Sequence, residues 1–456
     1  MEVQAESGRW QAGRSARRPD DQFQVGRRVM RSSQALTRTL AQALVALALS
    51  GYAVASLAQG TPAACANPRK ADGTMSEPYY RGVEQAMDLM SKSRNQEAID
   101  KLSKMVDGGG SEYEKSIVYY NLGFAYSSKN DYTNAAKNFE KSLALNAMPQ
   151  QQYDQLLFNL GQLYVADKQY DNGIRTLERY IAESCTPVPP DANIFLAQAY
   201  LEQKRFKDAL PQVDQAIAKS KTVKESWLQL KLAINYELKN YRACADVLLK
   251  LISITPAKSD YWKQLSGMFM ELKDDAGAVA TLALADRQGF LTTPNEIRNL
   301  YNIYMSVDLP YKAGTFLQDA IDKNRVPGDE KNLNSVADAW INARESARAE
   351  SVLKKLAAQS EKGEYYFKLG AMYGDDERWK ESKEMLEKAI SKGNLGTKAG
   401  EAYLRLGVAN YGLKDYRSAE TAVNKAMSYD NVRGQAGQWL RQIRSDQGLA
   451  AGAPAG

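Results

Sequence analysis

Residues 116–149 read S-I-V-Y-Y-N-L-G-F-A-Y-S-S-K-N-D-Y-T-N-A-A-K-N-F-E-K-S-L-A-L-N-A-M-P. Within this stretch Leu122, Gly123, Tyr126, Ala135 and Phe139 follow the spacing L-G-x2-Y…A-x3-F. The small residues let two antiparallel helices approach closely, and the large residues fill the space around that contact. The pattern therefore predicts a helix-turn-helix hairpin of about 34 residues. Since one hairpin cannot bury its apolar face alone, the pattern also predicts stacked copies.

The same pattern recurs along the chain and predicts an all-α array. Ten candidate units begin near Tyr79, Ser116, Asp154, Pro190, Glu225, Ser259, Pro294, Glu330, Gly363 and Gly400. Connectors that contain Gly or Pro separate them, and no strand-like alternation of period two appears. A last helix, from about Gly434 to Gln447, fits a capping helix that covers the final apolar face.

The spacing resembles the tetratricopeptide repeat (TPR). That resemblance implies a right-handed superhelical solenoid of about ten TPR-like hairpins over residues 79–447, with a C-terminal capping helix. In this family the first helix of each hairpin lines a groove for protein partners. The family's contact positions carry over to Tyr120, Phe124, Phe158, Gln162, Ile194, Gln198, Arg298, Asn302, Phe367 and Tyr411.

The composition of these groove positions indicates the type of ligand. The N-terminal third is apolar and aromatic, and the middle is polar with Arg298 and Asn302. This does not match the Lys and Asn clamp that chaperone-binding TPR proteins use for a C-terminal carboxylate. An extended or helical segment with apolar anchors fits better. The alternative is that residues such as Phe124 and Phe158 simply pack between hairpins.

The N-terminus is typical of an export signal. Four arginines between residues 27 and 38 precede an apolar run over residues 40–57, which ends in a small-x-small site at Ala58. We expect an N-terminal extension and cleavable signal peptide over 1–58, with Met30 as an alternative start, and then a flexible lead over 59–78. A retained transmembrane helix is the alternative, but polar residues and Gly interrupt the run and no second such stretch follows. Residues 448–456 are expected to form a disordered tail.

Three cysteines, Cys65, Cys185 and Cys244, would meet an oxidising compartment after export. The odd number allows at most one pair within the chain. Cys244 takes the small core position equivalent to Ala135, so we expect it to be a buried apolar residue. A disulfide between Cys65 and Cys185 is the remaining hypothesis. A lipid anchor at Cys65 is an alternative that the preceding Pro-Ala-Ala sequence disfavours.

Composition argues against several classes of function. The chain has no histidine, which removes the commonest general base and metal ligand. Acidic clusters such as Asp375-Asp376-Glu377 lie where helices are expected to end, so a solvated capping role is favoured. Residues 1–58 hold eight arginines and four acidic residues, which leaves a net charge of only about +2 for the rest of the chain and no footprint for nucleic acid. We predict no enzyme activity, cofactor or metal.

The overall layout resembles the periplasmic TPR proteins that are described as components of TonB systems. The resemblance includes a signal peptide followed by one uninterrupted array, and the run Tyr119–Tyr126, Y-Y-N-L-G-F-A-Y. It implies a periplasmic scaffold that assists TonB-dependent outer-membrane transport of iron complexes, with TonB, ExbB, ExbD or outer-membrane receptors as partners. Two alternatives stay open. One is an envelope-assembly adaptor for outer-membrane protein insertion, cell-wall synthesis or a Tol-type division complex, and the other is a regulatory subunit of a periplasmic enzyme.

Overall fold

The computed structural model describes residues 65, 68–70 and 73–447. These residues form twenty-one α-helices and no strand. The expected signal peptide (1–58), part of the expected lead and the expected tail (448–456) lie outside the described residues. No described helix is long and apolar enough to cross a bilayer.

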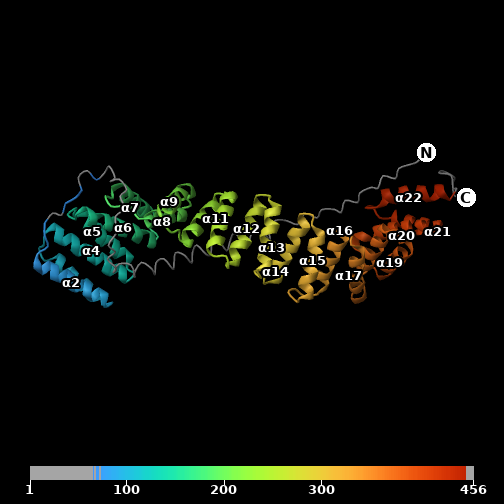
Figure 1. The fold of residues 1–456 in the computed structure, drawn as a ribbon, viewed down its shortest axis with the longest axis horizontal. Coiled ribbons are helices and arrows are strands. Elements are labelled where there is room, and N and C mark those ends of the chain that lie inside the picture. Colours follow the sequence, from blue (N-terminus) through green and yellow to red (C-terminus); the bar gives the residue numbers. More distant parts are fainter. Residues whose placement is uncertain (1–64, 66–67, 71–72, 448–456) are drawn as a thin grey trace. The chain divides into compact units, whose positions relative to one another are not determined.

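The helices divide into two compact units, of which the first ends at Leu272. Unit 1 contains α2 (Glu77–Ser91), α3 (Asn95–Val106), α4 (Glu112–Ser128), α5 (Tyr132–Ala144), α6 (Gln150–Ala166), α7 (Tyr170–Glu183), α8 (Pro190–Glu202), α9 (Phe206–Lys219), α10 (Glu225–Glu237), α11 (Tyr241–Ile254) and α12 (Ser259–Glu271). Consecutive helices pair as hairpins, α2 with α3, α4 with α5 and so on, and each second helix packs on the first helix of the next hairpin (Figure 1). Contacts also join α2 with α4, α6 with α8 and α8 with α10. We call the surface formed by α2, α4, α6, α8 and α10 the first-helix face.

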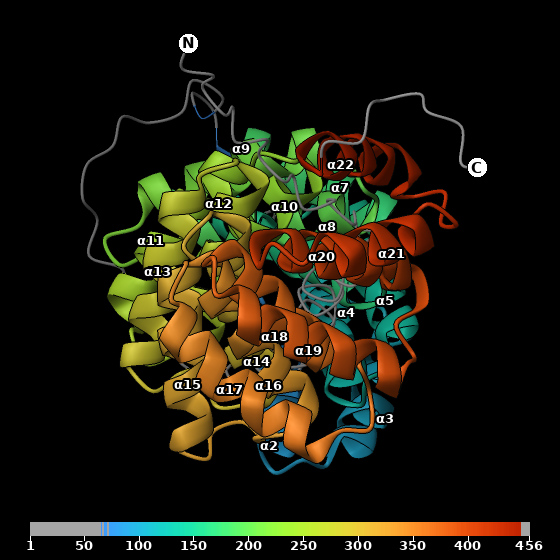
Figure 2. The same ribbon diagram turned by 90° about the vertical axis from the view of Figure 1, so that its right-hand side faces the viewer.

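Unit 2 begins at Lys273 and repeats this arrangement. It contains α13 (Asp275–Arg287), α14 (Pro294–Ser306), α15 (Pro310–Asp322), α16 (Glu330–Asn342), α17 (Ser346–Gln359), α18 (Glu364–Asp375), α19 (Trp379–Lys392), η3 (Gly396–Lys398), α20 (Ala399–Gly412), α21 (Tyr416–Ala426) and α22 (Arg433–Asp446). Its closest helix pairs are α18 with α19 and α20 with α21 (Figure 2). The expected all-α array of helical hairpins is thus confirmed within each unit.

The small residues of the sequence pattern lie at the helix contacts. A Cβ atom added to Gly123 would lie 2.3 Å from the ring of Phe139, and one added to Gly161 would lie 2.6 Å from Leu177. Phe139 and Leu177 are themselves buried. Glycine is therefore required at these two positions because the second helix of the same hairpin occupies the space that a side chain would need.

The turn inside each hairpin depends on a residue in the left-handed conformation. Lys204, between α8 and α9, has a φ of 59°, and Lys168 takes the same place between α6 and α7 with a φ of 62°. After Lys204, the Arg205 N–H donates to the Tyr200 carbonyl at 2.8 Å. A hydrogen bond of this kind ends an α-helix when the residue just before the donor, here Lys204, has the left-handed conformation. Glycine is the usual residue at this position, but here it is lysine. The sequence therefore contained no glycine that would have marked these turns.

Helix α22 covers the end of unit 2, as expected of a capping helix. Its Ile443 and Ala436 are buried against Leu404 of α20 and Val423 of α21, and Trp439 and Leu440 pack on the same cluster. The helix therefore removes from water the apolar side that α20 and α21 would otherwise expose.

Candidate partner-binding face and a disulfide-anchored segment

The predicted contact residues Tyr120 and Phe124 lie on α4 and are half-buried. Their rings meet edge to face at 4.8 Å, and both also contact Phe139 of α5, at 5.8 and 5.3 Å. The Asn159 side chain on α6 donates a hydrogen bond to the Tyr120 hydroxyl at 3.3 Å. Burial raises the pKa of Tyr120 to about 12. The two residues thus support the hairpin and still present part of each ring at the surface.

Phe158 on α6 continues this aromatic row. It stacks on Tyr180 of α7 at 5.2 Å and approaches Phe195 of α8 at 6.1 Å. Gln162, one turn further along α6, and Gln198 on α8 are also half-buried. Phe158 therefore packs between hairpins, whereas Gln162 and Gln198 contribute amide groups to the first-helix face.

Two predicted contact residues contribute almost no surface. Ile194 and Phe367 are each 6% exposed, in the cores of unit 1 and unit 2 respectively. In the structure both residues pack between helices, which is the alternative role that the sequence left open for groove positions. The helical pattern could not separate the two roles because a groove position and a packing position lie on the same side of a first helix.

The remaining predicted residues belong to unit 2. Arg298 on α14 is half-buried and its Nε atom has no hydrogen-bond partner, whereas Asn302 is exposed. Tyr411 on α20 donates to Asp446 of α22 and packs edge to face on Trp439 at 5.4 Å. Tyr411 therefore holds the capping helix in addition to any role at the surface.

An ion-pair ladder in unit 2 was not foreseen from the sequence. Asp375, expected to be a solvated helix-end carboxylate, accepts from Arg405 of the next first helix at 2.9 Å. Lys368 of α18 similarly reaches Asn334 at 2.7 Å and Asp338 on α16. The partners are 30 to 34 residues apart. One repeat length between opposite charges is the signal that could have revealed these pairs.

Two exposed apolar residues extend the first-helix face onto α2. Tyr80 is 59% exposed and Met87 is 49% exposed. In the repeat register, Ala86 and Ala98 correspond to Gly123 and Ala135 of the next hairpin, so Met87 corresponds to Phe124 and Tyr80 to the second contact position. Sequence reasoning missed both because it carried no contact positions over to this hairpin, which has Leu89 where the repeat has Tyr.

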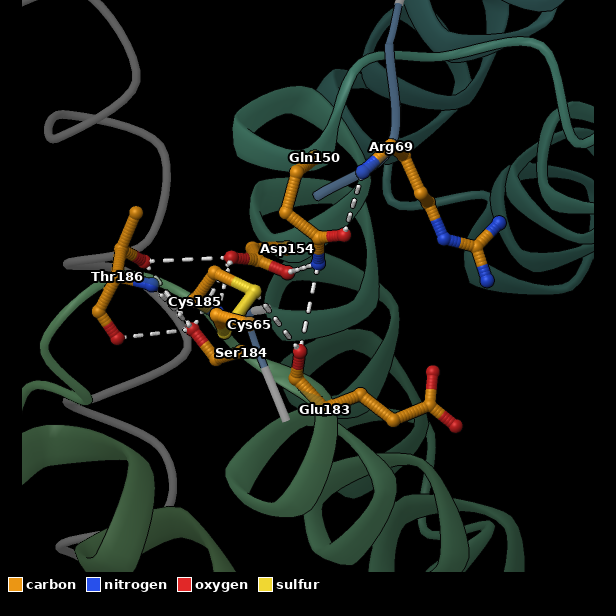
Figure 3. The surroundings of a disulfide bond; sticks show 8 residues. All are labelled: Cys65, Arg69, Gln150, Asp154, Glu183, Ser184, Cys185 and Thr186. Atoms are coloured by element: carbon orange, nitrogen blue, oxygen red, sulfur yellow. Dashed lines mark hydrogen bonds between the residues drawn. A yellow bond between two sulfur atoms is a disulfide. The ribbon is translucent and has the colours of Figure 1, made fainter. Parts of the chain in front are cut away.

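A disulfide joins the N-terminal segment to the third hairpin (Figure 3). Cys65 is bonded to Cys185, which follows α7, with their Cα atoms 5.4 Å apart. This is the pairing that the cysteine count left as a hypothesis. The turn that carries Cys185 is held by the buried Asp154 of α6, whose carboxylate accepts from the Cys185 N–H at 3.0 Å and from the Ser184 hydroxyl at 3.2 Å.

The described residues that follow Cys65 contact two further hairpin ends. The Arg69 carbonyl accepts from the Gln150 N–H at 3.0 Å at the start of α6, and the Arg69 guanidinium lies 3.7 Å from the centre of the Tyr153 ring. Ser76 then donates its N–H to Glu114 of α4 at 2.8 Å. We call the described residues between Cys65 and Ser76 the strap, since they connect α7, α6 and α4.

The carboxylate of Glu114 on α4 accepts the hydrogen bond from Ser76, the last residue of the strap. It is buried, which by itself would raise its pKa, but hydrogen bonds from Ser76 and Ser111 outweigh burial and lower the pKa to about 2. Ser111 and Glu114 also form a capping box at the start of α4. The strap and the helix cap therefore share one carboxylate.

Cys244 is the free cysteine of the described residues, and it is fully buried in α11. Burial raises the pKa of its thiol to about 12, so the group is protonated near neutral pH. Its position is the small slot expected from the repeat. Among the described residues, no cluster of carboxylates and cysteines is arranged to hold a metal ion.

Family models match three segments of the chain. A tetratricopeptide repeat model matches residues 158–222, which include most of α6 and all of α7, α8 and α9. A second tetratricopeptide repeat model matches residues 117–147, over α4 and α5, and residues 400–432, over α20 and α21. The chain has no significant match among curated proteins.

Several solved structures resemble the chain at low identity. A tetratricopeptide repeat protein from Parabacteroides merdae is 14% identical, with a TM-score of 0.36, and the match covers 57% of this chain and 98% of that chain. MamA from Desulfovibrio magneticus is 18% identical, with a TM-score of 0.35, over 41% of this chain and 99% of that chain. YrrB, a TPR protein with an unusual peptide-binding site, is 16% identical, with a TM-score of 0.34, over 40% and 90%. At these values the likenesses support no argument about partners.

Proposed function

We propose that this chain, which contains tetratricopeptide repeats, is a non-enzymatic adaptor that binds a segment of a partner protein on the first-helix face of unit 1. The observation that carries the proposal is the exposure of Tyr80 and Met87 on α2, where Met87 is in register with the half-buried Phe124 of the next hairpin. Large apolar side chains exposed on one first helix, with a half-buried ring at the matching position of the next one, favour a docking surface.

The chemistry of this face indicates what kind of segment it would bind. The aromatic rings of Tyr120, Phe124 and Phe158 offer apolar contact, and the amides of Gln162 and Gln198 can donate to and accept from a peptide backbone. None of these side chains carries a formal charge. An extended or helical segment held by apolar anchors is therefore favoured over one recognised by its charge.

We place the adaptor in the periplasm and take a TonB system as its first candidate assembly. The export signal expected in residues 1–58 supports this location, as does the Cys65–Cys185 disulfide, because disulfides persist in oxidising compartments. The resemblance to periplasmic TPR proteins of TonB systems makes TonB, ExbB, ExbD and outer-membrane receptors for iron complexes the partners to test.

The test is crosslinking and capture from intact cells, with and without iron limitation. The wild type is compared with Tyr80→Ser/Met87→Ser, which changes two exposed side chains and should leave the fold intact. The matched control is Leu249→Ser/Ile254→Ser, since these residues of α11 are similarly exposed, at 51% and 49%, but lie on a second helix.

Capture of TonB, ExbB or ExbD by the wild type and the control, with loss in the Tyr80/Met87 variant, is the expected result. A captured set without these proteins would contradict the TonB assignment, and envelope-assembly proteins in their place would favour the alternative adaptor role. Equal capture by all three forms would contradict the assignment of the binding face.

A further inference from the structure

A cavity of about 390 Å³ lies between α5, α6 and α7, all within unit 1. Its lining residues are Glu140, Leu143 and Ala144 of α5, Leu157, Leu160 and Tyr164 of α6, and Arg175, Thr176 and Arg179 of α7. Two of the three helices, α5 and α7, are second helices, so the cavity does not belong to the first-helix face. Its volume is near the lower end of the range for ligand pockets, about 300–1,000 Å³.

The walls of the cavity differ in character. Leu157 and Leu160 are buried and form an apolar floor, whereas Glu140, Arg175 and Arg179 are exposed and charged at the rim. A ligand that fills the cavity would thus bury an apolar group at the floor and place polar groups at the rim. Because the rim is exposed, the ligand can continue beyond it as a polypeptide chain.

The cavity lies at a junction between hairpins that lacks a feature of other junctions. Tyr200 donates to Glu178 of the preceding second helix, and the guanidinium of Arg205 covers its ring at 4.5 Å. At Tyr373, Arg378 takes the same place at 4.2 Å.

Tyr164 likewise donates to Glu140 of the preceding second helix. The residue five positions after Tyr164 is Gln169, however, and its amide instead donates to Asp167 at 2.6 Å. No arginine therefore stands where Arg205 and Arg378 cover their tyrosines.

The charged side chains at the rim differ in their hydrogen-bond and ion-pair partners. Glu140 accepts the Tyr164 hydroxyl, and Arg179 pairs with Glu183 at 3.0 Å. Arg175 donates to the neutral Asn172 side chain at 2.5 Å, and no carboxylate among the described residues forms an ion pair with it. The guanidinium of Arg175 therefore keeps donors for a carboxylate, which it can bind through two parallel hydrogen bonds.

Second helices differ at these two positions, and α5 has the lysines Lys137 and Lys141 there. In the next second helix, α9, the residues 36 positions after Arg175 and Arg179 are Pro211 and Gln215. The repeat pattern alone does not require either arginine, because the corresponding residues of α9 are uncharged.

We propose that this cavity binds a segment of a partner protein in which a leucine-sized apolar side chain lies next to a carboxylate. The apolar side chain contacts Leu157 and Leu160, and the carboxylate pairs with Arg175. This second binding site does not rest on the function proposed for the first-helix face.

The experiment measures fluorescence anisotropy of labelled heptapeptides with the full chain. Two peptides carry a central leucine with a glutamate directly before or after it, and two control peptides replace the glutamate with glutamine or the leucine with alanine. We expect at least one leucine–glutamate peptide to bind. Each control peptide lacks either the carboxylate or the apolar side chain, so we expect its affinity to be about tenfold lower, which corresponds to about 1.4 kcal/mol of binding free energy.

Three variants assign the binding to the cavity. Arg175→Glu reverses the charge at the rim, Thr176→Trp fills the cavity without changing charge, and each should lower the affinity about tenfold or more. Arg242→Glu, an equivalent reversal at an exposed position of α11, should leave binding unchanged. Tyr80→Ser/Met87→Ser should also leave it unchanged, which separates this site from the first-helix face.

The proposal is overturned if neither leucine–glutamate peptide binds the wild type, or if Arg175→Glu and Thr176→Trp bind as well as the wild type does. A small amphipathic acid such as 4-phenylbutyrate serves as a further probe. Saturable binding of this acid at Arg175, without binding of either peptide, would replace the peptide assignment with a small-molecule site.

Discussion

Removing the disulfide tests how much the strap stabilises unit 1. Cys65 and Cys185 are 120 residues apart, and the loop that they close includes the first three hairpins. We propose to compare oxidised wild type with Cys65→Ser/Cys185→Ser. Serine is close to cysteine in size, so the main change is the loss of the covalent link.

The magnitude follows from the entropy of the unfolded chain. A crosslink that closes a loop of this length lowers the entropy of the unfolded state by an amount worth about 5 kcal/mol at 25 °C. Measured losses are usually smaller, about 2–5 kcal/mol, because the unfolded state keeps some structure. The variant does not change Arg69 or Ser76, whose hydrogen bonds also hold the strap, so we expect the loss to fall within this range.

The assay is urea denaturation followed by circular dichroism at 222 nm, together with non-reducing peptide mapping of the wild type. Addition of a phosphine reductant should lower the urea midpoint of the wild type to that of the double variant and should not change the variant itself. Cys244→Ala is the matched control, since it removes the buried thiol and leaves the disulfide in place. Equal midpoints for oxidised and reduced wild type, or free thiols at Cys65 and Cys185 in the mapping, would refute the reasoning.

Three further predictions concern single residues of unit 1. Gly123→Ala should destabilise the protein by about 1–3 kcal/mol in urea denaturation because the added Cβ atom would overlap Phe139. The control is Gly267→Ala in α12, where an added Cβ atom meets nothing within 4 Å, and this variant should be more stable than the wild type by up to about 1 kcal/mol. Similar losses of stability for both variants would contradict this packing argument. Glu114→Gln should lower the free energy of unfolding by about 2–3 kcal/mol at pH 7. Since the pKa of Glu114 in the folded protein, about 2, is below the usual value, this stabilisation is present above pH 5 and is lost as the pH falls towards 2. A difference in stability between variant and wild type that did not shrink on acidification would contradict this prediction. Lys204→Gly should raise the thermal midpoint, with a gain of about 1 kcal/mol, because glycine adopts a φ of 59° without steric cost; an unchanged or lower midpoint would show that the lysine is not strained there.

The candidate sites were foreseen to different degrees. Tyr120 and Phe124 were located by the repeat register, and the structure places both at the surface of α4 while packing them on Phe139. Ile194 and Phe367 were selected by the same rule and are buried. The register specifies which side of a helix a residue occupies, but the size of the neighbouring side chains decides whether that residue reaches the surface.

Contacts between hairpins were harder to foresee. Asp375 and Arg405 pair across neighbouring first helices, and nothing within either helix indicates the pair. The cavity beside Arg175 likewise depends on side chains from three helices. Sequence reasoning works along one helix at a time, whereas these features depend on the distance between helices.

The sequence alone determined the helical hairpin and its repetition, because the alternation of large and small residues at Leu122, Gly123, Ala135 and Phe139 is a local requirement of close helix packing. The sequence also limited the chain to at most one internal disulfide and left Cys65–Cys185 as the hypothesis for it. Only the tertiary structure decided that the strap from Cys65 reaches Glu114 and that a cavity opens beside α7. The physical reason is that hairpin formation depends on residues less than one repeat apart, whereas the strap and the cavity depend on how successive hairpins stack.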